Sequence, residues 1–321
     1  MIASGKIQLK RIQPAVARVI YLSYVLFGIS FLSFGLFALA PGDPAEIILR
    51  MRHEAPTLEQ IAELRLEMGL DQPLPLRYVH WLSRAAKGDL GRSWQSGEPV
   101  CSELAGRLPA TLELTLASFG FIVVFSTAAG VLCGIGRNGI VDQTGRMLSI
   151  LAMSVPSYWL GFLLVYCFAM KLGWLPVMGR GGPEHLLMPA VTLGLAATAM
   201  QGRVLRASLI EVLGQDHVRF AVAKGLKRRN VLLRHVLRNA MGPVATLWGI
   251  SLGNLLAGSA IVETVFSWPG LGRLIVNAIL SRDIPMLQGA VLVAALAVAG
   301  ANLAGDVVQR QLNPRLGEET R

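Results

Sequence analysis

Six stretches of this 321-residue chain run for 18 to 24 residues without a charged side chain. About 20 apolar residues in a helix cross a hydrocarbon layer of ~30 Å with every backbone polar group bonded inside the helix. Buried helices of soluble proteins are rarely so long or so numerous, and 53% of all residues are hydrophobic. We therefore predict an all-α membrane protein with six transmembrane helices, at residues 19–42, 114–136, 147–170, 185–202, 239–262 and 284–305.

Lys and Arg are shared unequally among the segments between these runs. Positive charges stay on the cytoplasmic side during insertion. With the N-terminus inside, the cytoplasmic segments hold 18 of the 30 Lys and Arg, nine of them within residues 203–238. We predict that both termini are cytoplasmic, and we attribute the net charge of +10 to topology rather than to nucleic-acid binding.

The first apolar run ends in Ala38-Leu39-Ala40, a pattern typical of signal-peptide cleavage, but its length and Pro41 directly after it favour a retained helix. The predicted organisation is therefore a cytoplasmic segment (1–18), a first transmembrane helix (19–42), an extracytoplasmic helical segment (43–107), a five-helix core (108–306) with a cytoplasmic loop (203–241), and a cytoplasmic tail (307–321).

The extracytoplasmic segment contains the start and stop signals of two short helices. Thr57 and Gln60 have capping-box spacing, and Gly69 is placed to end that helix. A second apolar stripe precedes Gly88; its members are Leu74, Tyr78, Trp81, Leu82 and Ala85. These helices either stiffen the outer mouth of a bundle or contact a partner that delivers cargo, and Trp81 either lies at the lipid boundary or packs on the bundle.

A basic segment, residues 211–240, lies between two of the apolar runs. A helix ending near Lys224, a glycine at 225 free to take positive φ, and a second helix through Arg238 predict a protruding helix-turn-helix. Small side chains at Ala221 and Ala223 would let a partner approach closely, and Phe220 would fill an apolar pocket. The alternative is a solvated basic loop that binds anionic lipid.

Residues 219–225, RFAVAKG, have the spacing of the EAA motif through which permeases of ABC importers contact their ATPases. With other blocks of sequence they resemble the B-type permeases of dipeptide, oligopeptide and nickel importers. The blocks are LAPGDP (39–44), GLDQPL (69–74), GDLG (88–91), LPATLEL (108–114), SVPSYWL (154–160), RVLRAS (203–208), ETVFSWPGLG (263–272) and RDIP (282–285).

The resemblance implies a type I permease in a bacterial inner membrane, surrounded by lipid. It implies a homologous second permease, two ABC ATPase subunits and an extracytoplasmic solute-binding protein as partners, in a hetero- or homodimeric permease pair. Arg219 and Phe220 depart from the Glu-Ala that begins the family motif. The residues that the resemblance assigns to ATPase coupling are Arg219, Phe220, Ala221, Ala223, Lys224, Gly225 and Leu237.

The chain lacks the residue patterns of an enzyme. A phosphate-binding P-loop needs G-x-x-x-x-G-K-[ST], and the only Gly-Lys pair is Gly5-Lys6. The five histidines are scattered and the three cysteines form no metal-binding spacing. We predict no catalytic residue, cofactor or metal site, and expect ATP hydrolysis to come from separate subunits.

Four residues are candidates for a translocation pathway or gate. Glu113 and Glu263 lie at the outer ends of the second and fifth predicted spans, where each is either wetted at the interface or lines the path. Pro156 is expected to kink the third span, and Asn254 to form an interhelical hydrogen bond or to line the path. Gly249 and the small residues after it suit close packing against a partner permease.

Two questions remain open at this level. A secondary transporter or channel without an ATPase partner is the alternative, although such proteins carry more intramembrane ionisable residues or an inverted repeat. The cargo is nickel, a metal chelate, or a di- or oligopeptide. The segments 174–179 and 181–185 look more similar to the nickel branch of the family.

Overall fold

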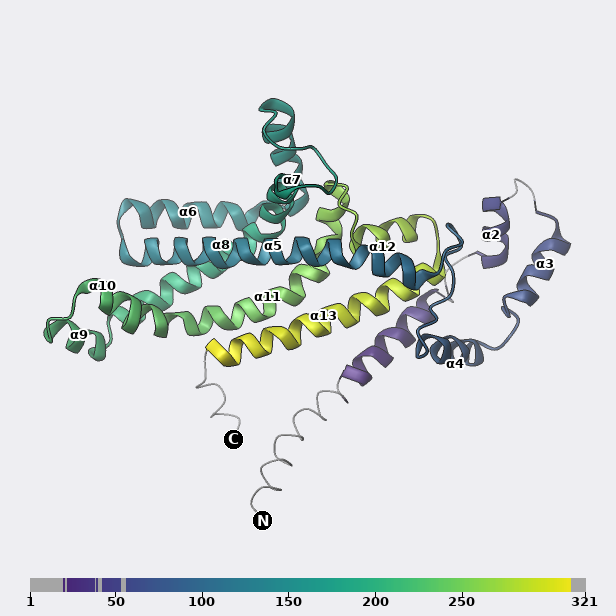
Figure 1. Cartoon of the computed structure of the whole chain (residues 1–321), viewed down its shortest axis with the longest axis horizontal. Helices are drawn as coiled ribbons and strands as arrows, with labels where there is room; N and C mark the ends of the chain where they lie inside the picture. Colours follow the sequence, from purple (N-terminus) through teal and green to yellow (C-terminus); the bar gives the residue numbers. More distant parts are fainter. Residues whose placement is uncertain (1–19, 21, 38, 40–41, 53–55, 313–321) are drawn as a thin grey trace, which may run out of the picture. The chain divides into compact units, whose positions relative to one another are not determined.

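The structure of the protein, a computed structural model, describes residues 20, 22–37, 39, 42–52 and 56–312. The predicted segment 1–18 and the end of the predicted tail lie outside these residues. The described chain consists of helices and loops with one isolated bridge, between Arg92 and Pro99, and holds no β-strand. It forms two compact units, Met1–Leu108 with Leu274–Ala299, and Pro109–Arg273 with Gly300–Arg321 (Figure 1).

The first unit contains both helices predicted between residues 43 and 107. Helix α3 (Leu58–Glu67) starts at Thr57 with both capping-box hydrogen bonds formed, and Gly69 follows it at φ +64°. Helix α4 (Leu74–Ala85) ends shortly before Gly88, at φ +83°. A further helix, α2 (Pro44–Arg52), was not predicted.

Helix α4 packs on the N-terminal helix Leu22–Phe37 through aromatic rings. The Tyr78 ring lies 5.3 Å from that of Phe34 and 5.6 Å from that of Phe31, centre to centre. The Tyr78 hydroxyl shares a 2.9 Å hydrogen bond with the Ser30 hydroxyl. Trp81 joins this cluster, with its ring centre 6.1 Å from that of Phe34. Of the two positions predicted for Trp81, the lipid boundary and a packed position, the structure shows packing against a helix.

The second unit is built around two long helices, α8 (Pro183–Leu213) and α11 (Arg238–Val265), which pack along each other. The other helices are α6 (Ile140–Ser154), α7 (Ser157–Leu164), α9 (Asp216–Ala223), α10 (Arg228–Asn230) and two π-helical stretches, Val165–Lys171 and Val231–Leu237. Helices α5 (Val100–Ile135), α12 (Leu271–Leu280) and α13 (Ile284–Leu312) contribute residues to both units. Helix α12 was not predicted.

Among the residues that the structure describes, three helices are long and apolar enough to cross a membrane: Val100–Ile135, Arg228–Val265 and Ile284–Gly305. A fourth candidate is the bent pair of Ile140–Ser154 and Ser157–Lys171. Helix α8 has the length of a span, but the polar residues Thr192, Thr198 and Gln201 dilute its apolar stretch. The predicted total of six spans therefore stays a prediction.

The third predicted span is not one straight helix. Its two halves meet at an angle of 105°, with Val155 in an extended conformation and Pro156 as the first residue before α7. Proline removes a backbone donor and restricts the residue before it to extended geometry, so the helix stops instead of kinking gently. The expected kink at Pro156 is in fact a complete break.

The glycines Gly249 and Gly253 of α11 pack against another helix of the same chain. A Cβ on Gly249 would meet the Gly305 carbonyl oxygen at 3.1 Å, and one on Gly253 would meet the side-chain oxygen of Asn302. Small residues let two helix backbones approach closely. The prediction that Gly249 packs against a partner permease is therefore wrong, because α13 of the same chain occupies that face.

Candidate functional site: the basic coupling loop

Helix α9 is positioned by a tight connection from α8. Gly214 ends α8, and Gln215 takes an extended conformation before α9 begins at Asp216. The Gln215 amide donates to the Val212 carbonyl at 3.0 Å, and the Arg219 amide donates to the Gln215 carbonyl at 3.3 Å. The acid at the first position of α9 suits the positive end of the helix dipole.

Gly225 ends α9 in a Schellman motif. The Gly225 amide donates to the Val222 carbonyl at 2.9 Å, and the Leu226 amide donates to the Ala221 carbonyl at 3.3 Å. These are the two reverse bonds of that motif, and they require a left-handed residue, here Gly225 at φ +77°. The predicted helix ending near Lys224 with a positive-φ glycine is confirmed, and the returning segment runs through α10 into α11.

One face of α9 packs onto α8 and the π-helical stretch Val231–Leu237. Val218 and Ala221 are buried in a cluster with Leu205, Leu209 and Val236. Ala221 is 7% exposed, so its expected place at a partner interface is wrong: its methyl group belongs to the core of this chain. Leu237 also packs against this cluster and serves to hold the loop in place.

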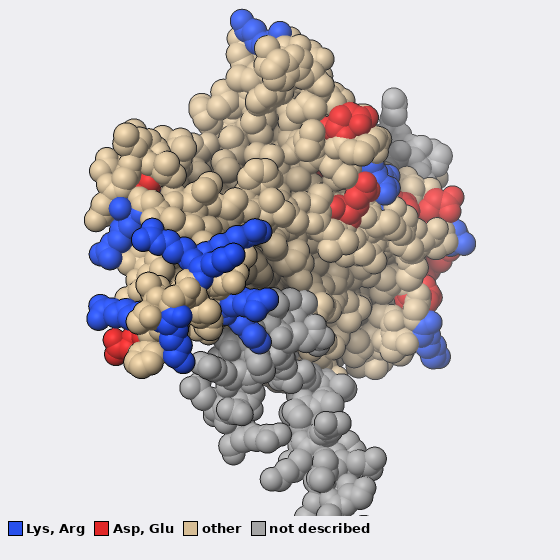
Figure 2. Space-filling view, turned by 60° about the vertical axis from the view of Figure 1, so that its left-hand side comes forward, with Lys and Arg blue, Asp and Glu red and all other residues tan. Residues whose placement is uncertain are grey.

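The other face of α9 is open. Phe220 is 68% exposed, and the Lys224 ammonium lies 5.9 Å from the centre of its ring. Arg219, Ala223 and Gly225 are exposed on the same loop. Within residues 211–240 seven Lys and Arg face two acids, Glu211 and Asp216. In the view that brings this end of the unit forward, Lys and Arg gather on the surface with few acids between them (Figure 2).

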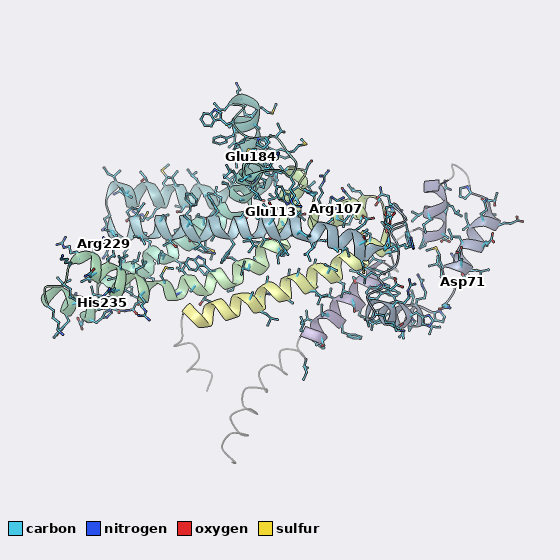
Figure 3. All side chains as sticks on the ribbon, in the orientation of Figure 1. Asp71, Arg107, Glu113, Glu184, Arg229 and His235 are labelled. Carbon is cyan, nitrogen blue, oxygen red and sulfur yellow. The ribbon has the colours of Figure 1, made fainter. Side chains whose placement is uncertain are left out.

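Glu113 lies on α5, far along the same unit from Arg229 and His235 of the loop (Figure 3). Its carboxylate accepts from both the Nε and Nη2 atoms of Arg180, each at 2.7 Å. The ion pair is partly exposed, so Glu113 is accessible but its charge is balanced. The sequence offered no signal for this partner, which lies 67 positions away.

Glu263 is fully buried, with 0% exposure. It accepts from the Thr111 hydroxyl at 2.7 Å and from the Arg273 amide at 2.9 Å. The Leu271 amide in turn donates to Thr111 at 2.8 Å. The carboxylate thus fastens the first turn of α12 to α5, and its predicted position on the pathway is wrong because its oxygens face this network and not a solvent-filled path.

The last candidate, Asn254, is exposed on α11 and forms no hydrogen bond within the described part of the chain. The expected interhelical bond is therefore not present. Asn254 shares one face with other exposed residues at helical spacing: Ile250, Ala257, Gly258 and Ile261. No group of three or more His, Cys, Asp or Glu among the described residues is arranged to hold a metal ion.

Two family models match this chain. Residues 126–318 match the binding-protein-dependent transport system inner membrane component, and residues 12–115 match the N-terminal region of such membrane components. The chain is 40% identical over 301 residues to the glutathione transport system permease protein GsiC of Escherichia coli K12, covering 94% of this chain and 97% of that protein. The same protein from Shigella flexneri is equally similar, at 40% over 301 residues.

Solved structures share the fold. An inward-facing MetNI methionine ABC transporter is 20% identical, with a TM-score of 0.55 over 65% of this chain and 96% of that one. An amino acid ABC transporter with histidines is 14% identical, with a TM-score of 0.51 over 65% and 94% of the two chains. The helical fold is that of type I ABC permeases.

Proposed function

Since this chain belongs to the binding-protein-dependent transport system inner membrane component family and is a permease subunit of an ABC importer, we propose that it carries a short peptide of the glutathione class. It is a multi-pass inner-membrane protein and not an enzyme. Membership in this family overrules the alternative of a secondary transporter or channel without an ATPase.

The observation that carries the cargo proposal is the 40% identity to GsiC over nearly the whole of both chains. Glutathione is a small modified tripeptide, which lies within the peptide range predicted from sequence. The similarity of segments 174–179 and 181–185 to the nickel branch has no counterpart in the names of these relatives. We therefore do not propose nickel as the cargo.

Uptake into proteoliposomes tests the cargo. The permease is reconstituted with its partner permease, its ATPases and its binding protein, and radiolabelled glutathione, a dipeptide and a nickel–histidine chelate are compared. We expect ATP-dependent uptake of glutathione that unlabelled glutathione suppresses. Uptake of the nickel chelate without uptake of glutathione would refute the proposal.

We further propose that two ABC ATPase subunits serve the importer, one of them bound to the open face of α9. Phe220 provides an exposed aromatic anchor, Ala223 and Gly225 leave room for a partner surface, and Arg219 and Lys224 add positive charge. Aromatic side chains that enter a pocket supply much of the binding energy at such interfaces. Ala221 and Leu237 support this face from beneath.

Phe220→Ala tests the docking surface, because an exposed side chain can be removed without opening a cavity. We expect at least tenfold weaker ATPase binding, corresponding to about 1.4 kcal/mol. Gly225→Val should act similarly through the backbone, since a β-branched residue is costly at φ +77°. The matched control is Leu58→Ala on α3, which removes another exposed apolar side chain. Normal ATPase retention by Phe220→Ala would place the docking site elsewhere.

The chain is proposed to form half of the pathway with a homologous permease, and a solute-binding protein is proposed to deliver cargo from outside. The exposed face of α11 around Asn254 and the Glu113 end of α5 are the surfaces we assign to the path. Asn254→Cys should react with a water-soluble maleimide in membranes, and cargo should slow the reaction. If the maleimide does not react with the cysteine of Asn254→Cys, residue 254 does not line the path.

A further inference from the structure

A short π-helix joins the coupling loop to the span that follows it. It covers Val231–Leu237, between α10 and α11, and the helix Arg228–Val265 runs through it without interruption (Figure 1). This π segment therefore lies where the loop and α11 meet. π-helices are rare and occur mostly as single-turn bulges in α-helices, frequently at functional sites.

The buried residues show why this turn has π geometry. Three buried residues follow the buried Val236 at intervals of four: Ala240, Val244 and Trp248. Val231, also buried, lies five positions before Val236. With α-helical winding, the fifth position would turn Val231 about 100° further from the buried face, whereas i→i+5 bonding closes a turn over five positions and keeps it there. The turn thus contains one residue more than an α-helix would hold.

The exposed face of the same helix shows the extra residue as well. Leu233 and Arg234 are exposed, and the next exposed pair, Arg238 and Asn239, follows five positions later. Leu233 is 48% exposed and lies outside the buried cluster around Val236. The extra residue can therefore be removed at Leu233 without taking a side chain from the core.

The π segment is packed against the part of the loop that an ATPase would move. Val231 and Val236 lie in one buried cluster with Val218 and Ala221 of α9. The segment contacts both α9 and α8 and continues into α11. A displacement of α9 therefore acts on α11 through the π segment.

We propose that the π segment is the joint that converts movement of the loop into rotation of α11. This rests on the proposed docking of an ATPase to α9. When the ATPases close, the segment exchanges π for α winding, and the loop turns by about 100° relative to α11, the angle of one residue. Both windings give the amides inside the segment a carbonyl partner, five or four positions back, so the exchange leaves none of them unpaired at the edge of a membrane.

The burial of Val231 sets the direction of this exchange. In α winding the extra residue turns Val231 away from the buried face, and exposing an apolar side chain is unfavourable. The π winding is therefore the resting state, and closure of the ATPases has to drive the change. Without the extra residue, α winding and burial of Val231 would be compatible, and the joint would have one winding only.

Deletion of Leu233 tests the joint in the whole importer. The buried residues then follow one another at intervals of four, so the chain should fold with continuous α winding and should retain its ATPases. Cargo-stimulated ATP hydrolysis and uptake in proteoliposomes should both fall about tenfold, within the range of ordinary coupling between two sites. Leu233→Ala is the matched control, because it removes the same side chain but keeps the number of residues, and it should hydrolyse and transport like the wild type.

The winding can also be observed directly on the wild type, which decides the matter even where the deletion variant does not fold. Electron cryomicroscopy of the assembled importer is carried out without nucleotide and with ATP on a hydrolysis-deficient ATPase. We expect i→i+5 bonding over residues 231–237 in the first state and i→i+4 bonding in the second.

Four results would overturn the proposal. They are normal coupling in the deletion variant, equal loss of coupling in Leu233→Ala, loss of ATPase binding in the deletion variant, and unchanged π winding in both nucleotide states. Failure of the docking proposal has a different signature, since Phe220→Ala would then retain the ATPase.

Discussion

Glu263 provides a sharp test of how this fold is held together. The carboxylate accepts two hydrogen bonds, from the Thr111 hydroxyl and the Arg273 amide, and is fully buried. Glu263→Ala leaves both donors without their acceptor. A buried donor left unpaired costs about 1–3 kcal/mol, so the variant should lose about 2–6 kcal/mol of stability.

Glu263→Gln should be milder. The amide oxygen can accept from the Arg273 amide, but the amide nitrogen cannot accept from the Thr111 hydroxyl, so one buried donor and not two is left unpaired. We expect a loss of about 1–3 kcal/mol. The matched control is Glu113→Ala, which breaks a partly exposed ion pair of the kind that contributes about 0–1 kcal/mol.

The assay is thermal unfolding in detergent, followed by the loss of the monodisperse peak in size-exclusion chromatography. For a unit of this size each kcal/mol lowers the midpoint by roughly 2–4 °C, so Glu263→Ala should unfold at least about 4 °C below the wild type. Equal midpoints for Glu263→Ala and the wild type would refute the buried-acceptor argument. Normal stability but abolished uptake in Glu263→Gln would return this residue to the pathway.

Two further predictions follow from the packing and the charge distribution. Gly249→Leu should lower the unfolding midpoint by several degrees, since a Cβ there lies 3.1 Å from the backbone carbonyl oxygen of Gly305, whereas Gly258→Leu, with its nearest neighbour at 4.0 Å, should be tolerated; equal midpoints would contradict the close contact between α11 and α13. Alkaline phosphatase inserted near Ser96 should be active and one inserted near Lys227 inactive, because positive segments stay inside; the opposite pattern would reverse the proposed orientation.

Features that depend on neighbours along the chain were accessible from sequence. The capping box at Thr57 and the positive-φ glycine at 225 were predicted and are present, because each depends on hydrogen bonds between residues a few positions apart. The apolar runs likewise marked the long helices, since the hydrocarbon thickness sets a length that can be counted. The family resemblance followed from blocks of residues read directly along the chain.

Which face of each helix meets another part of the chain was decided only by the tertiary structure. Ala221 and Phe220 are adjacent in sequence, yet one packs in the core and the other is open, because α9 lies against α8. Glu263 became a buried acceptor because Thr111, 152 positions away, lies beside it. Gly249 meets α13 instead of a second subunit. Such roles depend on contacts between distant segments, and the periodicity of one helix does not specify its neighbour.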